Sequence, residues 1–309
     1  MDFKGQHVLS AKQFDKKSLL ALFKTASVME KALKNGKNLK LASGKIMATL
    51  FFEPSTRTRF SFEIAMLRLG GKVVSNADMM KTSSSTKKES FADTGKVVSQ
   101  MVDLIVMRSP EVDSVAKLSE KSDCPVINAG DGAEEHPTQA LLDLYTVWKH
   151  RGTLDGITFG MVGDLSHGRV PHSQAYLLRN FDVKFLFVSP KGLSMPKEIV
   201  NDLEKSGSEV EESEDLFLGV KQMDVVAMTR VQKERFESEE EYMKYEGSYV
   251  LDKNMIKRVK SDALILHPLP RVDEISSDVD DDPRSKYFEQ VLNGVAVRMA
   301  LIAKILGAK

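Results

Sequence analysis

Short apolar runs rich in β-branched residues alternate along the chain with amphipathic stretches. Strands separated by helical patterns are typical of parallel sheets whose strands are joined by crossover helices, so the pattern predicts an α/β fold. The predicted strands are 45–52, 73–75, 104–107, 126–128, 157–162, 183–188, 224–228 and 263–266.

Three stretches show the clearest helical periodicity. Phe60, Ile64 and Leu67 recur at spacings of four and three after the first strand, which predicts a helix with these side chains on one face. Leucines and aromatic residues share one face of a predicted helix over 138–150, and residues 287–306 are long and periodic enough for a terminal helix. We expect the helix over 138–150 to connect the two halves of the chain.

The length of 309 residues exceeds the usual size of one hydrophobic core. The strands fall into two sets, so we predict two domains, each a parallel sheet flanked by helices, joined by interdomain helices. The first domain covers residues 1–135 and is completed by the C-terminal helix 287–309, and the second covers residues 136–286. A cleft between two such domains can hold substrates.

The 44 basic and 44 acidic side chains cancel, so the whole molecule has no field that would drive it to nucleic acid or to an anionic membrane. Any anion site must therefore be local. No window approaches a membrane span, and residues 1–7 do not resemble a signal peptide. We expect a soluble, cytoplasmic protein that binds neither nucleic acid nor membrane.

The single cysteine, Cys124, cannot form an internal disulfide and has no companion at metal-ligand spacing, which fits a reduced compartment. A catalytic role would need a histidine partner that the sequence does not place, so a buried structural side chain is the better interpretation. The acidic runs 237–241 and 278–282 lack the spacing and the glycine of a calcium loop. We expect solvated loops there, and neither a metal nor a cofactor.

The segment Ser55–Arg59 carries three hydroxyls and two arginines between a predicted strand and a predicted helix. Backbone N–H groups at a helix start and the positive end of the helix dipole favour an anion, so the segment predicts a phosphate site. Ser55 could instead simply cap the helix, with the arginines as surface charges. That alternative explains a lone Ser-Thr pair better than it explains five polar ligands in five positions.

Residues Phe51–Arg59 read Phe-x-Glu-x-Ser-Thr-Arg-Thr-Arg and resemble the carbamoyl-phosphate signature of the aspartate and ornithine transcarbamoylase family. His136–Gln139 resembles the second signature of that family, and Met107–Pro110 resembles the strand end that supplies a further arginine. The order and spacing of these motifs agree over essentially the whole chain.

Three segments of the second half resemble members of this family that use aspartate as the acceptor, namely 164–169, 229–236 and 266–271. Ornithine-specific members typically have cysteine where Pro268 stands. Arg169 and Arg230 could pair with the two carboxylates of aspartate, because guanidinium groups match carboxylates bidentately. The resemblance thus implies transfer of the carbamoyl group of carbamoyl phosphate to the α-amine of L-aspartate, which gives N-carbamoyl-L-aspartate and phosphate for pyrimidine synthesis.

The resemblance also implies roles for individual residues. Ser55, Thr56, Arg57 and Thr58 would bind phosphate, and Arg57 would stabilise charge on the departing phosphate. The leaving phosphate can accept the proton of the amine, so no protein base is implied. The residues that would polarise the carbamoyl carbonyl are Arg108, His136 and Thr58. The groups that would hold the carbamoyl amide are Gln139 and the backbone carbonyls of Pro268 and Leu269.

Arg169, Arg230 and Gln232 would bind and orient aspartate, which turns two substrates into one reacting pair. Without the match to the family, His136 would be interpreted as a histidine satisfied at a helix start, and the two arginines as ordinary surface cations. Those interpretations do not explain why all these groups occur together.

In this family a loop from a neighbouring subunit completes the site, which implies a homotrimer with shared active sites. The corresponding stretch is 82–90, and it would supply Ser83 and Lys87, the lysine acting in catalysis and in aspartate binding. The usual Lys-Gly-Glu reads Lys87-Lys88-Glu89 here, so a shift of one residue would make Lys88 the ligand. Pro171 is a second departure, and we expect it in the first turn of a helix. Whether a separate regulatory chain joins the trimer is left open by the sequence.

Two alternatives remain, and a third is rejected. The chain could be a transcarbamoylase for another amino acid, or a non-catalytic relative that binds ligand or serves as a scaffold. The run Gly160–Asp164 after a strand suggests a nucleotide-binding turn, but its two glycines fall short of Gly-x-Gly-x-x-Gly.

Overall fold

The computed structural model describes residues 2–79 and 89–308. The chain divides into two compact units: unit 1 is Met1–Tyr145 with Val291–Lys309, and unit 2 is Thr146–Gln290. Both divisions fall inside helices, α6 (Pro137–Arg151) and α11 (Glu289–Ile305), so each of these helices contributes residues to both units. Within the described ranges, no helix is both long and apolar enough to cross a membrane.

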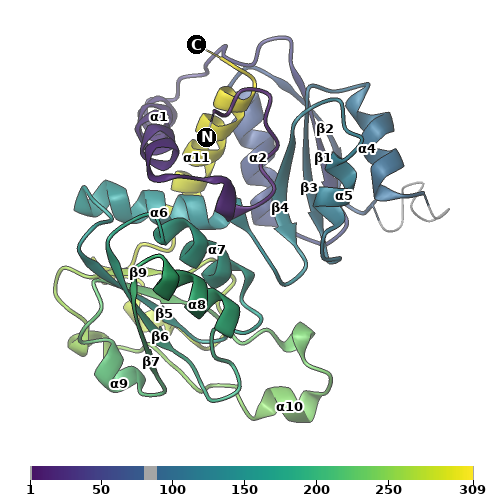
Figure 1. Ribbon diagram of the computed structural model, residues 1–309. Helices are drawn as coiled ribbons and strands as arrows, with labels where there is room; N and C mark the ends of the chain where they lie inside the picture. The colour runs from purple at the N-terminus through teal and green to yellow at the C-terminus, as the bar shows by residue number, and fades with distance from the viewer. Residues whose placement is uncertain (1, 80–88, 309) are drawn as a thin grey trace. The chain divides into compact units, whose positions relative to one another are not determined.

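Unit 1 is built on a four-stranded parallel sheet with the strand order β2-β1-β3-β4 (Figure 1). The strands are β1 (Ile46–Phe51), β2 (Lys72–Asn76), β3 (Leu104–Ser109) and β4 (Val126–Asp131). Every residue of β3 and β4 is buried, as expected for parallel strands covered on both faces, whereas the edge strand β2 is largely exposed. Cys124 is buried in the apolar cluster beside β4, as predicted.

Among the described residues, the α-helices that belong to unit 1 alone are α1 (Lys16–Lys34), α2 (Thr56–Arg68), α4 (Phe91–Ser99) and α5 (Ser114–Ser119). Helices α4 and α5 pack together on one face of the sheet, and α2 lies on the other (Figure 1). Helix α1 begins at Asp15, whose carboxylate accepts the Ser18 N–H at 2.7 Å, and the Ser18 hydroxyl reaches back to close a capping box.

The apolar face predicted for α2 differs from the face that packs on the sheet. The helix is present, but Phe60, Ile64 and Leu67 are 47%, 42% and 55% exposed, while Phe62 and Met66 are completely buried. Helical spacing identifies an apolar stripe without saying what covers it. Unit 1 therefore presents a stripe of three large apolar side chains, called here the α2 stripe, on its surface.

Unit 2 is built on a five-stranded parallel sheet with the strand order β7-β6-β5-β8-β9. The strands are β5 (Ile157–Val162), β6 (Val183–Val188), β7 (Glu209–Ser213), β8 (Val225–Met228) and β9 (Leu264–Leu266). All eight predicted strands are thus present, and β7 is an additional charged edge strand. Gly160 lies inside β5, where an added Cβ would come within 2.1 Å of the Met223 sulfur, so close packing accounts for this glycine.

The helices that lie wholly in unit 2 are α7 (Arg169–Leu178), α8 (Lys197–Lys205), α9 (Leu216–Gly219) and α10 (Glu239–Met243). Pro171 lies in the first turn of α7, as predicted, where a backbone N–H has no helical partner. The acidic run 237–241 is only partly a loop, because Ser238 caps α10 and Glu239 begins it. In the second run, Asp280 and Asp282 form ion pairs with Arg271 and Arg284.

Candidate active site

The order of strands in each sheet places the predicted ligands at comparable positions. In unit 1 the chain leaves β1 toward β2 on one side and later occupies β3 and β4 on the other, so the loops after β1 and β3 diverge at the β1/β3 junction. In unit 2 the same change of direction occurs between β5 and β8. Ligands of open α/β sheets bind at the carboxyl ends of the strands, at such junctions.

The loop after β1 leads directly into α2, whose N-cap is Ser55. The Ser55 side chain makes no capping hydrogen bond, in contrast to Ser90, whose hydroxyl accepts from the Asp93 N–H at the start of α4. The alternative that Ser55 simply caps the helix is therefore not supported. Its hydroxyl and the first N–H groups of α2 are positioned to bind an anion.

The other residues of the Ser55–Arg59 segment differ in exposure and in contacts. Thr56 and Arg57 are exposed in the first turn of α2, and Thr58 is buried. Arg59 is turned toward Glu63 one turn further along, with its Nε 3.6 Å from the carboxylate. Arg59 thus supports the helix, and Arg57 is the arginine of this motif that remains at the helix start.

Arg108 is the last residue but one of β3 and lies beside the loop after β1, where its carbonyl accepts the Phe52 N–H at 2.8 Å. It pairs in register with Phe51, and its Nη2 lies 2.5 Å from the Glu53 carboxylate, with both side chains largely buried. The sheet register therefore brings Arg108 to the same junction as Ser55. Glu53 was not among the predicted site residues, although it lies inside the motif.

His136 and Gln139 stand at the start of α6, which follows β4. His136 is buried, and its carbonyl accepts the Gln139 N–H at 3.0 Å, so the two residues are fixed by the first turn of the helix. One turn later the buried Asp143 carboxylate accepts from the Gln139 side chain. Arg298, from α11, donates to Ser61 in α2 and to Thr138 in α6.

Asp143 and Arg298 are polar residues that were not among the predicted site residues. The spacing of four between Gln139 and Asp143 on a predicted helix is a signal that could have indicated the first. Arg298 lies 160 positions from its partner Thr138 and 237 from Ser61, so no local pattern could have identified it.

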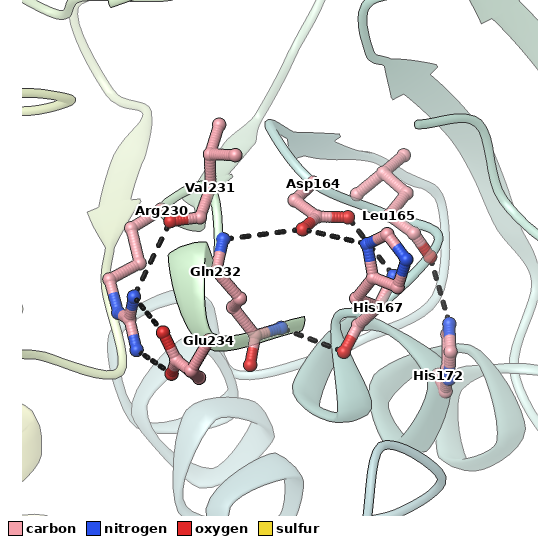
Figure 2. Close-up of polar contacts among 8 residues, drawn as sticks. All are labelled: Asp164, Leu165, His167, His172, Arg230, Val231, Gln232 and Glu234. Carbon is pink, nitrogen blue, oxygen red and sulfur yellow. Dashed lines mark hydrogen bonds and ion pairs between the residues drawn. The ribbon is translucent and has the colours of Figure 1, made fainter. Parts of the chain in front are cut away.

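In unit 2 the loops after β5 and β8 are joined by the buried carboxylate of Asp164 (Figure 2). It accepts the His167 N–H at 3.0 Å and the Gln232 N–H at 3.3 Å, and it also contacts the His167 ring. The Gln232 side chain donates to the His167 carbonyl at 2.7 Å. Gln232 is thereby held against the loop that leads to Arg169, the first residue of α7.

Arg230 follows β8 and is paired with Glu234, one turn away (Figure 2). Its guanidinium meets the carboxylate with two nitrogens, one of them at 3.0 Å, and also donates to the Val231 carbonyl. Burial alone would lower the pKa of Arg230, but the hydrogen-bonded Glu234 carboxylate raises this pKa above its ordinary value. This arginine is a permanent cation, held in a defined orientation.

The loop after β9 contains Pro268 and Leu269, and a buried pair fixes it. The Leu269 N–H donates to His267 Nδ1 at 2.8 Å, so the ring proton is on Nε2, which donates to Glu274 at 2.6 Å. Burial alone would raise the pKa of Glu274, but the hydrogen bond from His267 lowers this pKa below its ordinary value. Leu269 has a positive φ of 55°, and the peptide bond between Leu269 and Pro270 is cis.

Ser83, Lys87 and Lys88 lie outside the described residues, so the structure does not place the predicted contribution of a neighbouring subunit. In the ranges 2–79 and 89–308, no group of three or more His, Cys, Asp and Glu side chains could hold a metal ion.

Comparison with known proteins identifies the family. Residues 6–149 match the carbamoyl-P binding domain of the aspartate/ornithine carbamoyltransferases, and residues 155–305 match their Asp/Orn binding domain. The chain belongs to the aspartate/ornithine carbamoyltransferase family. The predicted family and the predicted two-sheet α/β fold are thus confirmed.

Two members of the carbamoyltransferase family illustrate the similarity in sequence. The chain is 48% identical to the aspartate carbamoyltransferase catalytic subunit of Thermococcus kodakarensis, with 99% of each chain covered. It is 47% identical to the corresponding subunit of Methanocaldococcus jannaschii, over 97% of this chain and 98% of that one.

Solved structures of the family give the same result. An aspartate transcarbamoylase from Trypanosoma cruzi in complex with carbamoyl phosphate and aspartate has a TM-score of 0.93 and 38% identity, with 98% of each chain covered. The catalytic subunit from M. jannaschii has a TM-score of 0.90 and 46% identity, again with 98% of each chain covered.

Proposed function

We propose that the chain catalyses transfer of the carbamoyl group from carbamoyl phosphate to the α-amine of L-aspartate. The observation that carries this function is the placement of two sets of ligands, one suited to a phosphate and one to carboxylates, at the strand junction of unit 1 and at the strand junction of unit 2. Unit 1 supplies most ligands of the donor, and unit 2 supplies the ligands of the acceptor. The Trypanosoma cruzi relative in complex with both compounds supports the assignment.

The donor half rests on the start of α2. Phosphate accepts from the first N–H groups of the helix, from the Ser55, Thr56 and Thr58 hydroxyls, and from Arg57. The capping geometry supports this role, because the Ser55 hydroxyl is not used by the helix itself. Arg57 adds the charge that a dianionic leaving group requires.

The carbamoyl carbon is attacked while its carbonyl oxygen is held by cations and donors. Arg108, His136 and Thr58 surround the oxygen that becomes negative as the amine nitrogen bonds to the carbon. The bond between the carbon and the bridging phosphate oxygen then breaks, and inorganic phosphate leaves with the electron pair. The amine proton passes to the departing phosphate, so atoms and charge balance without a protein base.

The acceptor half rests on the junction of β5 and β8. Arg230 and Arg169 bind the two carboxylates of aspartate, and Gln232 orients it. The backbone carbonyls of Pro268 and Leu269 hold the carbamoyl amide. The preset orientation of Arg230 by Glu234 supports this role, because a guanidinium fixed in advance loses little freedom on binding.

We further propose that the active chain is a homotrimer whose sites are shared. Ser83 and Lys87 of one subunit would enter the site of the next, with Lys87 contacting aspartate and Lys88 as the alternative. The α2 stripe supports an interface, because three large apolar side chains on one helix are rarely left exposed in a stable assembly. The buried free thiol of Cys124 is compatible with a cytoplasmic location.

The deciding experiment is a carbamoylation assay with aspartate that compares the parent with Arg57→Ala. We expect the variant to lose at least about a hundredfold in kcat/KM for carbamoyl phosphate, because a charged transition-state contact is removed. Arg68→Ala, on the same helix and bonded to Asn38, is the matched control and should stay near the parent. Full activity of Arg57→Ala would contradict the proposed phosphate site.

Two further arms separate the alternatives. Turnover with ornithine or acetylornithine, and none with aspartate, would assign a different acceptor. Binding of carbamoyl phosphate without any turnover would indicate a non-catalytic relative. Sharing of sites is tested by mixing dissociated Arg57→Ala subunits with Lys87→Ala subunits, because only shared sites regain activity in the reassembled mixture.

A further inference from the structure

Asp143 is a buried carboxylate that fixes the side chain of a proposed substrate ligand. Gln139 Nε2 donates to Asp143 Oδ1 at 2.9 Å, and the exposed fraction of Asp143 is 1%. A carboxylate accepts hydrogen bonds and does not donate them, so the amide of Gln139 must turn its nitrogen toward Asp143. The amide oxygen of Gln139 is thereby directed to the opposite side.

A second buried charge, the Arg298 guanidinium, interacts electrostatically with Asp143. Arg298 is 3% exposed, donates to Ser61 Oγ at 2.8 Å and to Thr138 Oγ1 at 3.3 Å, and lies over the Phe62 ring at 4.8 Å. Burial lowers the pKa of Arg298 to about 10, an effect that the negative charge of Asp143 opposes. The two groups stabilise each other, since a buried charge without an opposite neighbour is costly.

An ordinary helical pair is the simpler interpretation of Gln139 and Asp143. Side chains four positions apart on an exposed helix face often bond, for a gain of about 0.2–0.5 kcal/mol. Such a pair does not require the carboxylate to be withdrawn from water, which costs far more than the pair returns. The burial of Asp143 beside Arg298 therefore indicates a use beyond helix stability.

We propose that Asp143 is a positioning residue that selects the donor. It holds the Gln139 amide so that the oxygen of that amide accepts an N–H from the carbamoyl group, and the site thereby prefers carbamoyl phosphate to acyl phosphates without an N–H. The inference rests on the proposed function, in which Gln139 holds the carbamoyl amide. It adds how the orientation of that amide is set.

The preference has a direct chemical probe. Acetyl phosphate has the phosphate and the carbonyl of carbamoyl phosphate but a methyl group in place of the amide. Against a fixed acceptor oxygen the methyl leaves a polar atom unsatisfied, whereas the amide satisfies it. A glutamine free to rotate would present either its oxygen or its nitrogen and would distinguish the two compounds poorly.

The test compares the parent with Asp143→Asn, because asparagine can either donate or accept and so releases the Gln139 amide. Three quantities are measured: kcat/KM for carbamoyl phosphate, the inhibition constant of acetyl phosphate, and the dissociation constant of inorganic phosphate. We expect the first to fall by roughly tenfold or more, with the other two within about twofold of the parent. Glu30→Gln, which alters another buried carboxylate of unit 1, should leave all three unchanged.

Two outcomes would overturn the role of Asp143: an unchanged preference for carbamoyl phosphate in Asp143→Asn, or an equal loss for all three compounds, which a merely structural role would give. If Asp143→Asn does not fold, Asp143→Ser carries the test, because a serine hydroxyl can also either donate or accept. Loss of the preference there supports the inference, and its retention overturns it. An inactive parent would instead contradict the proposed function, so the two failures are distinguishable.

Discussion

Replacing Asp131 by asparagine should stabilise the protein, and by an amount that depends on pH. Asp131 ends β4 with 7% of its surface exposed, and its carboxylate lies 3.3 Å from the Ser114 hydroxyl. Burial raises the pKa of Asp131 from the ordinary 3.8 to about 6. Between about pH 4 and pH 6, the Asp131 carboxyl therefore holds a proton in the native state that it has already released in the unfolded chain.

The sign and size of the effect follow from this difference. Because the pKa in the folded state is the higher one, the stability from the protonated carboxyl is complete below about pH 3.8 and is lost as the pH rises to about 6. A difference of about two units corresponds to at most about 3 kcal/mol. Asp131→Asn escapes this loss, so its advantage over the parent should grow by about 1 kcal/mol per pH unit between pH 4 and 6 and then level off.

The assay is thermal unfolding of parent and variant, followed by circular dichroism at intervals from about pH 4 to pH 8, with a gain of a few degrees expected at neutral pH. Asp103→Asn is a control of opposite sign. Burial alone would raise the pKa of Asp103, but the hydrogen bond from Lys45 lowers it below the ordinary value. The ionised Asp103 carboxylate therefore stabilises the fold above about pH 3.8, and this stabilisation is lost as the pH falls through the pKa of the folded state. A gain for Asp131→Asn that is the same at every pH would refute the reasoning.

Three other changes test separate parts of the structure. Arg230→Lys should raise the KM for aspartate by roughly 10- to 100-fold in a steady-state assay, because lysine cannot make a bidentate contact with a carboxylate. Lys233→Ala is the control and should leave this KM unchanged. Equal effects of the two variants would show that Arg230 does not belong to the acceptor site. Glu274→Gln should lower the free energy of unfolding by about 1–3 kcal/mol, because His267 loses a buried charged partner. A urea unfolding curve that matches that of the parent would show that the pair does not stabilise the fold. If the proposed homotrimer forms through the α2 stripe, Leu67→Asp should convert it to smaller species in sedimentation. An unchanged mass would show that the α2 stripe is not an interface.

The fold was largely predictable because strands in parallel sheets are continuous apolar runs. The two strands over 157–162 and 183–188 have the same bounds in the sequence interpretation and in the structure. Strand β7 lies outside the predictions because its glutamates suit an exposed edge, where Lys184 of β6 pairs with Glu209 and Glu211. The position of β7 depends on its pairing with β6, and a local sequence pattern does not predict such a pairing.

The candidate site was predictable only where its residues are contiguous. Ser55 and Arg57 share one turn and were found together, whereas Arg298 reaches Thr138 only through the packing of α11. The burial of Asp143 is likewise a property of the folded unit. Periodicity indicated the α2 stripe, but it could not tell a face directed to the core from a face directed outward.

Helix α2 begins at the proposed phosphate site and carries the α2 stripe along its outer side. A compound that bound this stripe would therefore act on the same helix that carries the proposed phosphate site, without resembling carbamoyl phosphate or aspartate. Because the α2 stripe is proposed as a subunit interface, such a compound would compete with the neighbouring subunit for α2, and neither substrate would displace it. The outer face of α2 is for this reason a second target for inhibition, and one whose shape is independent of the chemistry that the enzyme performs.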